Sequence, residues 1–269
     1  MPQGSSRRRA RTYDPDKTWA AFVAQVGHVR VAVGELDEGQ WKAPSGLPGW
    51  DVRLLVAHVL RQVEALRQFL GQTPVPPGVK PADLSTWALS TAGIAGQLDA
   101  GTRATAAGTA DLNAALAAEA DLLPGLKDQA LRTDHAFPHP FSAMRALDFT
   151  VTRVVELVVH SDDLARATGV EVALDRQAVA VVVRLLVDAL AAKAPGNTVE
   201  VRVPPYAAVQ CVEGPRHTRG TPPNVVETDP LTWIRLATGR TAWHEALDAA
   251  RLTASGERAD LGPYLPVLG

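Results

Sequence analysis

The chain has 269 residues, of which 46% are hydrophobic and only 5% aromatic, and its formal net charge is -2. This length and apolar content can supply one large core or two ordinary ones, while the nearly neutral charge excludes a whole-molecule attraction to nucleic acid or to an acidic membrane surface. The sequence contains no uncharged apolar run of about 18 residues, so no membrane span is predicted.

The N-terminus carries a short basic cluster, Arg7 to Arg11. Such clusters are typical of solvated chain ends, and residues 1–12 are therefore predicted to be a disordered basic tail. No adequate apolar run follows before Asp14, so the cluster does not indicate a secretory signal. In the absence of a signal and of a membrane span, the expected location is the cytoplasm.

The first helix is expected to begin at Asp14 and Pro15. An Asp N-cap followed by proline at the first helical position is a common opening, and the helix is expected to run to about Leu36. Its core stripe is expected to comprise the apolar residues that recur at helical spacing: Trp19, Phe22, Val23 and Val26.

A second apolar helix is predicted after a loop at residues 44–49. Asp51 is its expected N-cap, and it is expected to end at Leu70, because Gly71 and a proline-rich stretch follow. His58 lies inside this helix among leucines and valines, and it is therefore expected to point toward the protein interior.

The middle of the chain is predicted to be mainly helical. Residues 83–131 are rich in alanine, but glycines and a proline interrupt them and leave the number of helices open. A loop at residues 135–140 is expected to precede a long apolar helix from Ser142 to Thr168, and a further helix is predicted over residues 175–193.

After residue 194 the pattern changes to a mixture of short strands and helices. Cys211, the only cysteine, excludes an internal disulfide and a zinc site made of several cysteines, and it is predicted to be a small buried residue of a strand. The alternation predicts a small α+β unit at residues 195–269, after a helical domain at residues 13–194. Its expected elements are strands at 198–203, 207–212, 224–227 and 251–255 and helices at 229–239 and 241–250.

Three side chains form a candidate metal site. Glu156 and His160 lie one helical turn apart on the apolar helix and so project in nearly the same direction. With His58 from the other helix they would form a set of one carboxylate and two imidazoles, which holds a divalent metal and leaves a coordination position open. The alternatives are a hydrogen-bonded or solvated Glu–His pair and a core histidine satisfied by a backbone carbonyl.

Other histidine pairs serve as comparisons. Glu213 and His217 have the same spacing as the candidate pair but enclose a Gly-Pro sequence, and His135 and His139 surround Pro138. Neither pair is expected on a regular helix.

The residues around the candidate ligands carry a family resemblance. The stretch Gly49 to His58, GWDVRLLVAH, and the stretch Arg153 to Ala167, RVVELVVHSDDLARA, together resemble the mycothiol-dependent maleylpyruvate isomerase family, a branch of the DinB/YfiT-like metalloproteins. The resemblance implies a DinB-like four-helix bundle in which His58, Glu156 and His160 bind a divalent metal of the zinc type.

The C-terminal unit carries a second resemblance. Residues 229–240 and 246–256 look like a bacterial sterol-carrier-protein domain, in which helices pack on a sheet around an apolar tunnel. The expected fold class is therefore α followed by α+β. A related domain also follows the helical domain in the maleylpyruvate isomerase family, so the order of the two parts agrees with the first resemblance.

The resemblance implies a metal-dependent enzyme that uses a low-molecular-weight thiol, mycothiol, for isomerisation or thiol transfer on a small electrophilic substrate. One alternative is a non-enzymatic binding protein whose C-terminal domain holds a lipid or another apolar ligand, and another is a degenerate family member that binds metal but has lost turnover. The sequence leaves open the substrate, the metal, the use of mycothiol and the oligomeric state. It also identifies no catalytic residue beyond the ligand set.

Several further residues near the candidate ligands have two interpretations. Asp163 either orients an imidazole or forms a surface ion pair, and Arg153 either binds a substrate carboxylate or, as we expect, pairs with Glu156. Trp41 and Trp50 are expected to be core residues rather than substrate platforms. Four arginines of the C-terminal unit either contact an anionic substrate or are solvated, namely Arg216, Arg219, Arg235 and Arg240.

Overall fold

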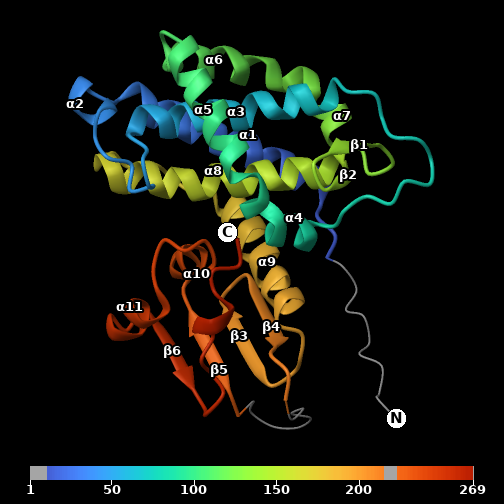
Figure 1. The fold of residues 1–269 in the computed structure, drawn as a ribbon, viewed down its shortest axis with the longest axis vertical. Coiled ribbons are helices and arrows are strands. Elements are labelled where there is room, and N and C mark those ends of the chain that lie inside the picture. Colours follow the sequence, from blue (N-terminus) through green and yellow to red (C-terminus); the bar gives the residue numbers. More distant parts are fainter. Residues whose placement is uncertain (1–10, 215–222, 269) are drawn as a thin grey trace.

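The computed structural model describes residues 11–214 and 223–268. Helices fill the first part of the chain, a four-stranded sheet with short helices forms the last part, and one long helix, α9, runs between them (Figure 1). The predicted fold class, an α domain followed by a small α+β domain, is confirmed. Within the described residues, no helix is long and apolar enough to cross a membrane.

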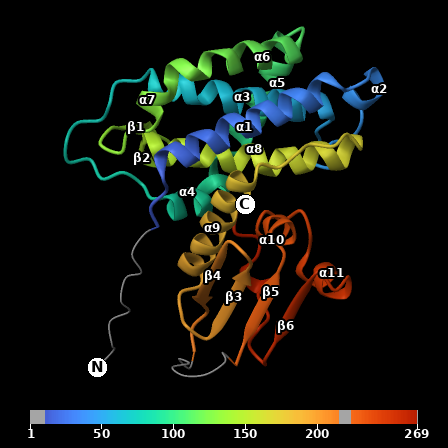
Figure 2. The ribbon, with the colours of Figure 1, turned by 180° about the vertical axis from the view of Figure 1, so that it is seen from behind.

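The helical domain is built on four helices that pack against one another, α1, α3, α6 and α8 (Figures 1 and 2). Helix α5 lies against α3 and contributes to one wall of the site described below. The α-helices of this part are α1 (Pro15–Gly34), α2 (Glu38–Trp41), α3 (Val52–Leu70), α4 (Leu84–Ser90), α5 (Ala95–Gly108), α6 (Leu112–Leu122), α7 (Lys127–Ala130) and α8 (Ala146–Thr168). Two short 3-10 helices, η1 (Thr91–Ile94) and η2 (Leu123–Leu126), join neighbouring helices.

Aspartate caps begin several of these helices at the predicted residues. Asp14, Asp51 and Asp175 each accept a hydrogen bond from the backbone N–H three residues later, which satisfies one of the free donors of the first turn. Gly169 ends α8 with φ 73, a left-handed conformation that glycine adopts without a steric penalty. The local sequence therefore determines where the long helices start and stop.

The structure corrects two predictions in the helical domain. Val23, expected in the core stripe of α1, is 39% exposed, because it follows Phe22 directly and so lies 100° around the helix from the buried face. The ligand-bearing helix begins at Ala146 rather than at Ser142. The predicted loop contains the strand β1 (Ala136–His139), and the first residues of the predicted helix form its antiparallel partner β2 (Ser142–Arg145).

The C-terminal domain is a mixed sheet in the order β4-β3-β5-β6, in which β3 and β5 are parallel and the other pairs are antiparallel. All of its predicted strands and helices are present, with ends shifted by one or two residues. They are β3 (Val199–Val203), β4 (Ala207–Cys211), β5 (Val225–Thr228), α10 (Pro230–Ala237), α11 (Trp243–Asp248) and β6 (Leu252–Ser255). The 3-10 helix η3 (Gly262–Tyr264) was not predicted, and the helix predicted at the end of the helical domain is α9 (Arg176–Lys193). Cys211 is fully buried in β4 as predicted, and burial raises the pKa of its thiol to about 12.

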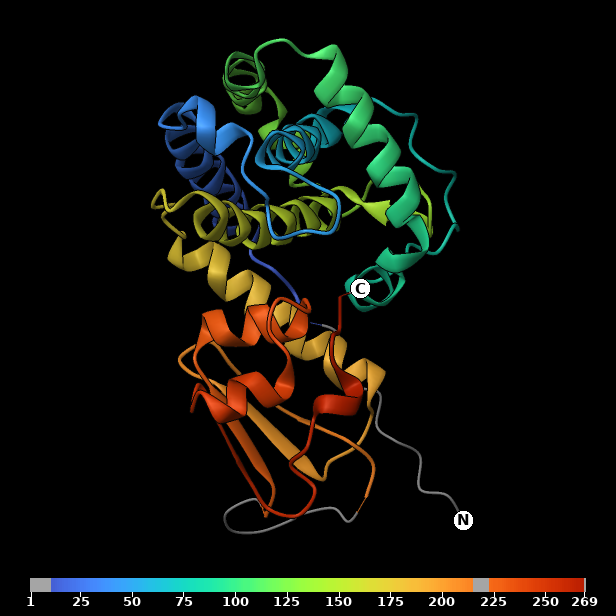
Figure 3. The ribbon, with the colours of Figure 1, turned by 60° about the vertical axis from the view of Figure 1, so that its left-hand side comes forward.

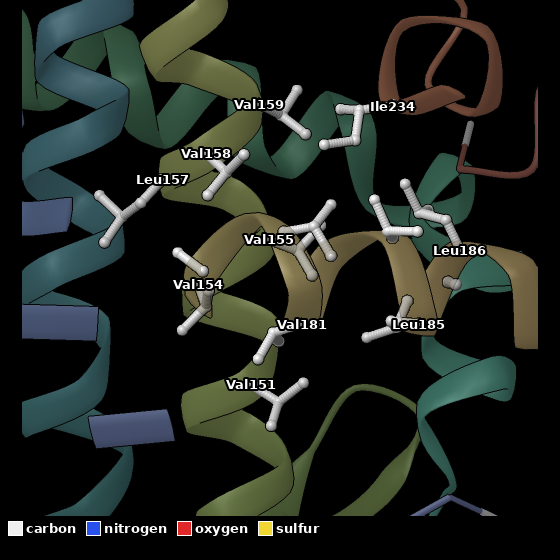
Figure 4. Close-up of a cluster of buried hydrophobic side chains, with 14 of the residues drawn as sticks. Val151, Val154, Val155, Leu157, Val158, Val159, Val181, Leu185, Leu186 and Ile234 are labelled. Atoms are coloured by element: carbon white, nitrogen blue, oxygen red, sulfur yellow. The ribbon is translucent and has the colours of Figure 1, made fainter. Parts of the chain in front are cut away.

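Helix α9 joins the two parts, because it packs on α1, α4 and α8 of the bundle and also on β4 and α10 of the C-terminal domain. Figure 4 shows the valines of α8 meeting Val181 and Leu185 of α9, with Ile234 of α10 beside Val159. These side chains are almost completely buried. The two parts therefore share one apolar core instead of being joined by a flexible linker.

Some sequence predictions concern residues that lie outside the described part of the chain. They include Arg216, Arg219, His217 and most of the predicted basic tail. At the end of that tail, Arg11 is described, and its Nε lies 2.7 Å from Asp188 Oδ2 on α9.

Candidate metal centre

The three predicted ligands lie together between α3 and α8. Glu156 Oε2 is 3.5 Å from His58 Nε2 and 3.3 Å from His160 Nε2. One ligand atom from each of the three residues lies within 4.8 Å of the other two. His58 lies about a hundred positions before Glu156 and His160 in the sequence. The packing of α3 against α8 therefore brings them together.

Each imidazole has a second contact that orients its ring. His58 Nδ1 is 3.2 Å from Thr102 Oγ1 on α5, and His160 Nδ1 is 3.0 Å from Asp163 Oδ2, one turn further along α8. With the Nδ1 atoms engaged, both Nε2 atoms are left toward Glu156. A ligating histidine that donates its other N–H to an oxygen acceptor is the usual arrangement in zinc proteins, so the donor set fits a zinc-type ion.

The ionisation of the three residues also suits a cation. Burial lowers the pKa of His58 to about 4, so that its imidazole is neutral near pH 7. Burial acts to raise the pKa of Glu156, but the hydrogen bonds with His160 and His58 and the charge of Arg153 outweigh it, and the pKa lies well below its ordinary value. Burial likewise lowers the pKa of His160, but Asp163 and Glu156 raise it overall. The acidic neighbours that favour a proton on His160 would equally favour a divalent cation.

Asp163 belongs to this cluster and is not on the surface. Its side chain is 3% exposed and contacts both His160 Nδ1 and Arg240 Nη2, the latter at 2.8 Å. The interpretation of Asp163 as a residue that orients an imidazole therefore agrees with the geometry. The ion pair that was the alternative is also present, but it is buried and joins the two domains.

Arg153 does not pair with Glu156 as we expected. Its Nη1 donates to Gln62, its Nε and Nη2 donate to Thr152, and its guanidinium lies 4.5 Å from the centre of the Phe149 ring. Within the described residues no carboxylate forms an ion pair with it. The spacing of three residues correctly placed Arg153 on the same face of α8 as Glu156. Its side chain, however, extends along the cavity wall and not toward Glu156.

Trp50, expected in the core, lies beside the ligands. Its ring centre is 5.2 Å from that of His58, and its Nε1 donates to Asp99 Oδ1 at 2.7 Å. Trp41 is partly buried against the hydrophobic core. Both tryptophans have packing contacts, and Trp50 additionally restricts the movement of the His58 ring.

A cavity of about 620 Å³ opens beside the ligands. Its walls come from α3, from the region of α4 and η1, from the hairpin and from α8, and the C-terminal domain contributes Arg240 and Leu268. Figure 3 shows the side where the two domains meet, with α4, in teal, between the bundle and the C-terminal domain. The site therefore combines a potential metal centre with a space large enough for a small organic molecule.

Sequence reasoning missed Gln62 and Thr102 as neighbours of the ligands. Gln62 lies four residues after His58, so helical spacing was an available signal, and its Nε2 is 2.8 Å from His58 Nε2. Thr102 comes from a separate helix and carried no such signal. Arg235 and Arg240 were considered as contacts of an anionic substrate, but each forms an ion pair with an aspartate of α8, Asp162 and Asp163 respectively.

Residues 8–165 match the family described as the mycothiol maleylpyruvate isomerase N-terminal domain, which is more than half of the chain. The chain belongs to this family. Residues 175–267 match a second family, described as a bacterial SCP ortholog, so the family match assigns α9 to the C-terminal part. Both predicted resemblances are thus confirmed.

Solved structures agree with the family matches. The crystal structure of the mycothiol-dependent maleylpyruvate isomerase is similar with a TM-score of 0.56 and 16% sequence identity, covering 90% of this chain and 93% of that chain. A mutant of that isomerase with one histidine replaced by alanine is similar with a TM-score of 0.55, at the same identity and coverage. No curated protein matches the chain by sequence. At this identity the structures support the fold, and the family membership supports the prediction of an enzyme over that of a binding protein.

Proposed function

We propose that this protein is a zinc enzyme that uses a low-molecular-weight thiol, such as mycothiol, to isomerise a small electrophilic substrate. The observation that carries the proposal is the convergence of His58, Glu156 and His160 at the edge of a cavity, with the outer nitrogen of each imidazole already engaged. Family membership supports the thiol and the isomerase class.

The protein groups have separate tasks in this proposal. His58, Glu156 and His160 would hold the metal, and Thr102 and Asp163 would keep the two imidazoles oriented. When bound, a divalent cation there would lower the pKa of a coordinated thiol, so that a thiolate is available near neutral pH. The apolar walls of the cavity would limit access of water and so strengthen the electrostatic interactions inside.

The proposed isomerisation consists of addition of the thiol, rotation and elimination of the thiol. Addition of the thiol sulfur to a carbon–carbon double bond forms a C–S bond and moves the π electrons onto the conjugated carbonyl. Rotation about the resulting single bond and elimination break the C–S bond, restore the double bond in the other geometry and return the thiol. If the enolate takes up a proton instead, for example the one released when the thiol ionised, the C–S bond persists and the reaction is a thiol transfer.

We also propose that the bundle, residues 13–194, is the metal-binding domain and that the domain at residues 195–269 covers one side of the cavity. This boundary leaves α9 with the bundle, on which it packs, although the match to the SCP family begins at residue 175. Binding of a lipid in the C-terminal domain and a cytoplasmic location stay predictions.

Elemental analysis of the purified full-length protein tests the metal. We expect about one zinc per chain, and replacement of Glu156 and His160 by Ala should abolish it. His139→Ala is the matched control, because His139 lines the same cavity but is not one of the three ligands. A protein that takes up neither zinc nor nickel nor another divalent ion, or that co-purifies with lipid instead, would contradict the proposal.

The zinc-loaded protein is then mixed with mycothiol and, one at a time, with cis α,β-unsaturated carbonyl compounds, maleylpyruvate among them. Conversion of the substrate that requires the thiol and leaves its concentration unchanged would support isomerisation, whereas consumption of the thiol would indicate transfer. Conversion at the same rate without thiol would contradict a thiol-dependent reaction.

A further inference from the structure

The inner wall of the cavity carries a buried cation, Arg153, that forms no direct ion pair with a carboxylate of the described residues, although the charge of nearby Glu156 acts on it. Arg153 is 8% exposed, lines the cavity and lies on α8 three residues before Glu156. The acceptors of its hydrogen bonds, Gln62 Oε1 and Thr152 Oγ1, are both neutral. Burial of a charge is costly unless an opposite charge compensates it. An anion bound in the cavity could therefore form a direct ion pair with Arg153.

The other charges at the cavity are already engaged. Three charged side chains line it, Arg153, Glu156 and Arg240, and Arg240 is paired with Asp163. The carboxylate of Glu156 lies between the two imidazoles. With a divalent ion at the proposed site, the cavity would hold excess positive charge, and a thiolate together with one carboxylate of the substrate would balance it.

Gln62 is the second polar group of this wall. Its amide nitrogen lies 2.8 Å from His58 Nε2, the atom that would ligate the metal. Metal binding at that nitrogen would release the amide N–H of Gln62, because a coordinated lone pair cannot accept a hydrogen bond. The released donor would then lie beside the guanidinium of Arg153, and the two would offer N–H groups to the two oxygens of one carboxylate.

The remainder of the lining is mostly apolar, with Gln68, Gln72 and Thr91 as further neutral polar residues. Phe69 and Phe149 stack with their ring centres 3.9 Å apart, and Trp87, Ile94 and Leu98 line the wall contributed by α4, η1 and α5. His139, which also lines the cavity, supplies no second cation near pH 7, since burial and the charge of Arg153 lower its pKa to about 4. A substrate with a carboxylate at each end would place the second one where the described lining offers no further cation without an ion pair, at a cost in desolvation.

We propose that Arg153 and Gln62 form a carboxylate-binding subsite and that the substrate is an α,β-unsaturated monocarboxylate whose apolar body lies against Phe69 and Phe149. This proposal rests on the proposed function, because it names the substrate class of the same site. It assigns Arg153 as the residue that determines specificity for the acidic end of the substrate.

The test is binding of trans-cinnamate, measured by calorimetry on the zinc-loaded full-length protein, with cinnamamide as the neutral analogue and maleate as the small dianion. Wild-type protein should bind cinnamate more tightly than either. Arg153→Gln should weaken cinnamate binding by about tenfold or more, since it removes charge-assisted hydrogen bonds. The same variant should change cinnamamide binding by less than about threefold. Arg132→Gln, at an exposed arginine that pairs with Asp134, is the control and should bind like wild type.

Arg153→Lys is the second variant, because it keeps the charge in the buried position and limits the risk of misfolding. It should recover part of the cinnamate affinity that Arg153→Gln loses. Cinnamate affinity that is equal in wild type, Arg153→Gln and Arg153→Lys would overturn the subsite, as would equal binding of cinnamate and cinnamamide by wild type. Tighter binding of maleate than of cinnamate would overturn the apolar body of the substrate.

Repeating the titration on metal-free protein separates this proposal from the proposed function. If the protein neither holds zinc nor uses a thiol but still binds cinnamate through Arg153, the proposed function fails and the subsite stands. If zinc and thiol turnover are present but cinnamate binds only with zinc and independently of Arg153, the carboxylate binds at the metal and the subsite fails.

Discussion

At the scale of single residues, Asp163 connects the ligand His160 to the C-terminal domain. Its Oδ2 lies 3.0 Å from His160 Nδ1 and 2.8 Å from Arg240 Nη2, in an environment where the aspartate is 3% exposed. Hydrogen bonding from His160 and Arg240 outweighs burial and holds the pKa of Asp163 far below its ordinary value. The carboxylate is therefore ionised, fixes the orientation of the imidazole and increases its basicity toward a metal.

Asp163→Asn should weaken zinc binding by about 10- to 100-fold, because the imidazole loses its charged acceptor. Zinc affinity is measured by competition with a chromophoric chelator. Asp162→Asn is the matched control, since Asp162 also pairs with an arginine of the C-terminal domain but does not contact a ligand. Wild-type zinc affinity in Asp163→Asn would contradict this role. An equal loss of zinc affinity in both variants would show that the effect comes from a changed position of the C-terminal domain.

Sequence spacing predicted residues on one helix better than partners from different helices. Glu156, His160 and Asp163 are on one face of α8, so the period of 3.6 residues was sufficient to relate them. Thr102 comes from α5 and Arg240 from the C-terminal domain, and no local pattern relates either to the ligands. Arg153 shows a further limit, because spacing gives the direction of a side chain at Cβ but not the path of a long, flexible one.

At the scale of elements, the capping residues were the most informative signals. Asp51 begins α3 and its Oδ1 accepts a hydrogen bond from Leu54 N at 2.8 Å. The hairpin before α8 was missed because its strands are short and β1 contains Pro138. The N-cap of α8, Arg145, makes no side-chain cap hydrogen bond, so nothing in the sequence marked the first turn of that helix. The helix starts capped by Asp14, Asp51, Asp175 and Asp229 were predicted, whereas the uncapped start of α8 was misplaced by four residues.

Asp51→Ala should lower the free energy of unfolding by about 1 kcal/mol, because the first turn of α3 loses its side-chain acceptor. Urea unfolding followed by circular dichroism measures the change. Asp51→Ser is the control, since serine is a comparable N-cap and should restore most of the stability. An alanine variant as stable as wild type would show that the cap has no net effect in this helix.

At the scale of the whole molecule, two neighbouring ion pairs fix the C-terminal domain to the bundle. Asp162 and Asp163 follow each other near the end of α8, and they bind Arg235 and Arg240, respectively, with two hydrogen bonds each. Together with the apolar contacts of α9, they position Arg240 and Leu268 at the mouth of the cavity. The site is therefore complete only when the two domains are seated on each other.

A double-mutant cycle on Asp162→Asn and Arg235→Gln should give a coupling free energy of about 1–2 kcal/mol, because this pair has two short hydrogen bonds and its aspartate is 8% exposed. The free energies come from urea unfolding of the full-length protein. The exposed pair Arg132–Asp134 is the reference, with side chains 45% and 64% exposed, and its coupling should be clearly smaller because solvent screens it. If the coupling of Asp162 and Arg235 is no larger than that of the exposed pair, this ion pair does not hold the domains together, and the apolar contacts of α9 and the Asp163–Arg240 pair do so without it. In that case Arg240 would keep its place at the cavity in Arg235→Gln, and the zinc affinity and cinnamate binding of that variant would equal those of wild type.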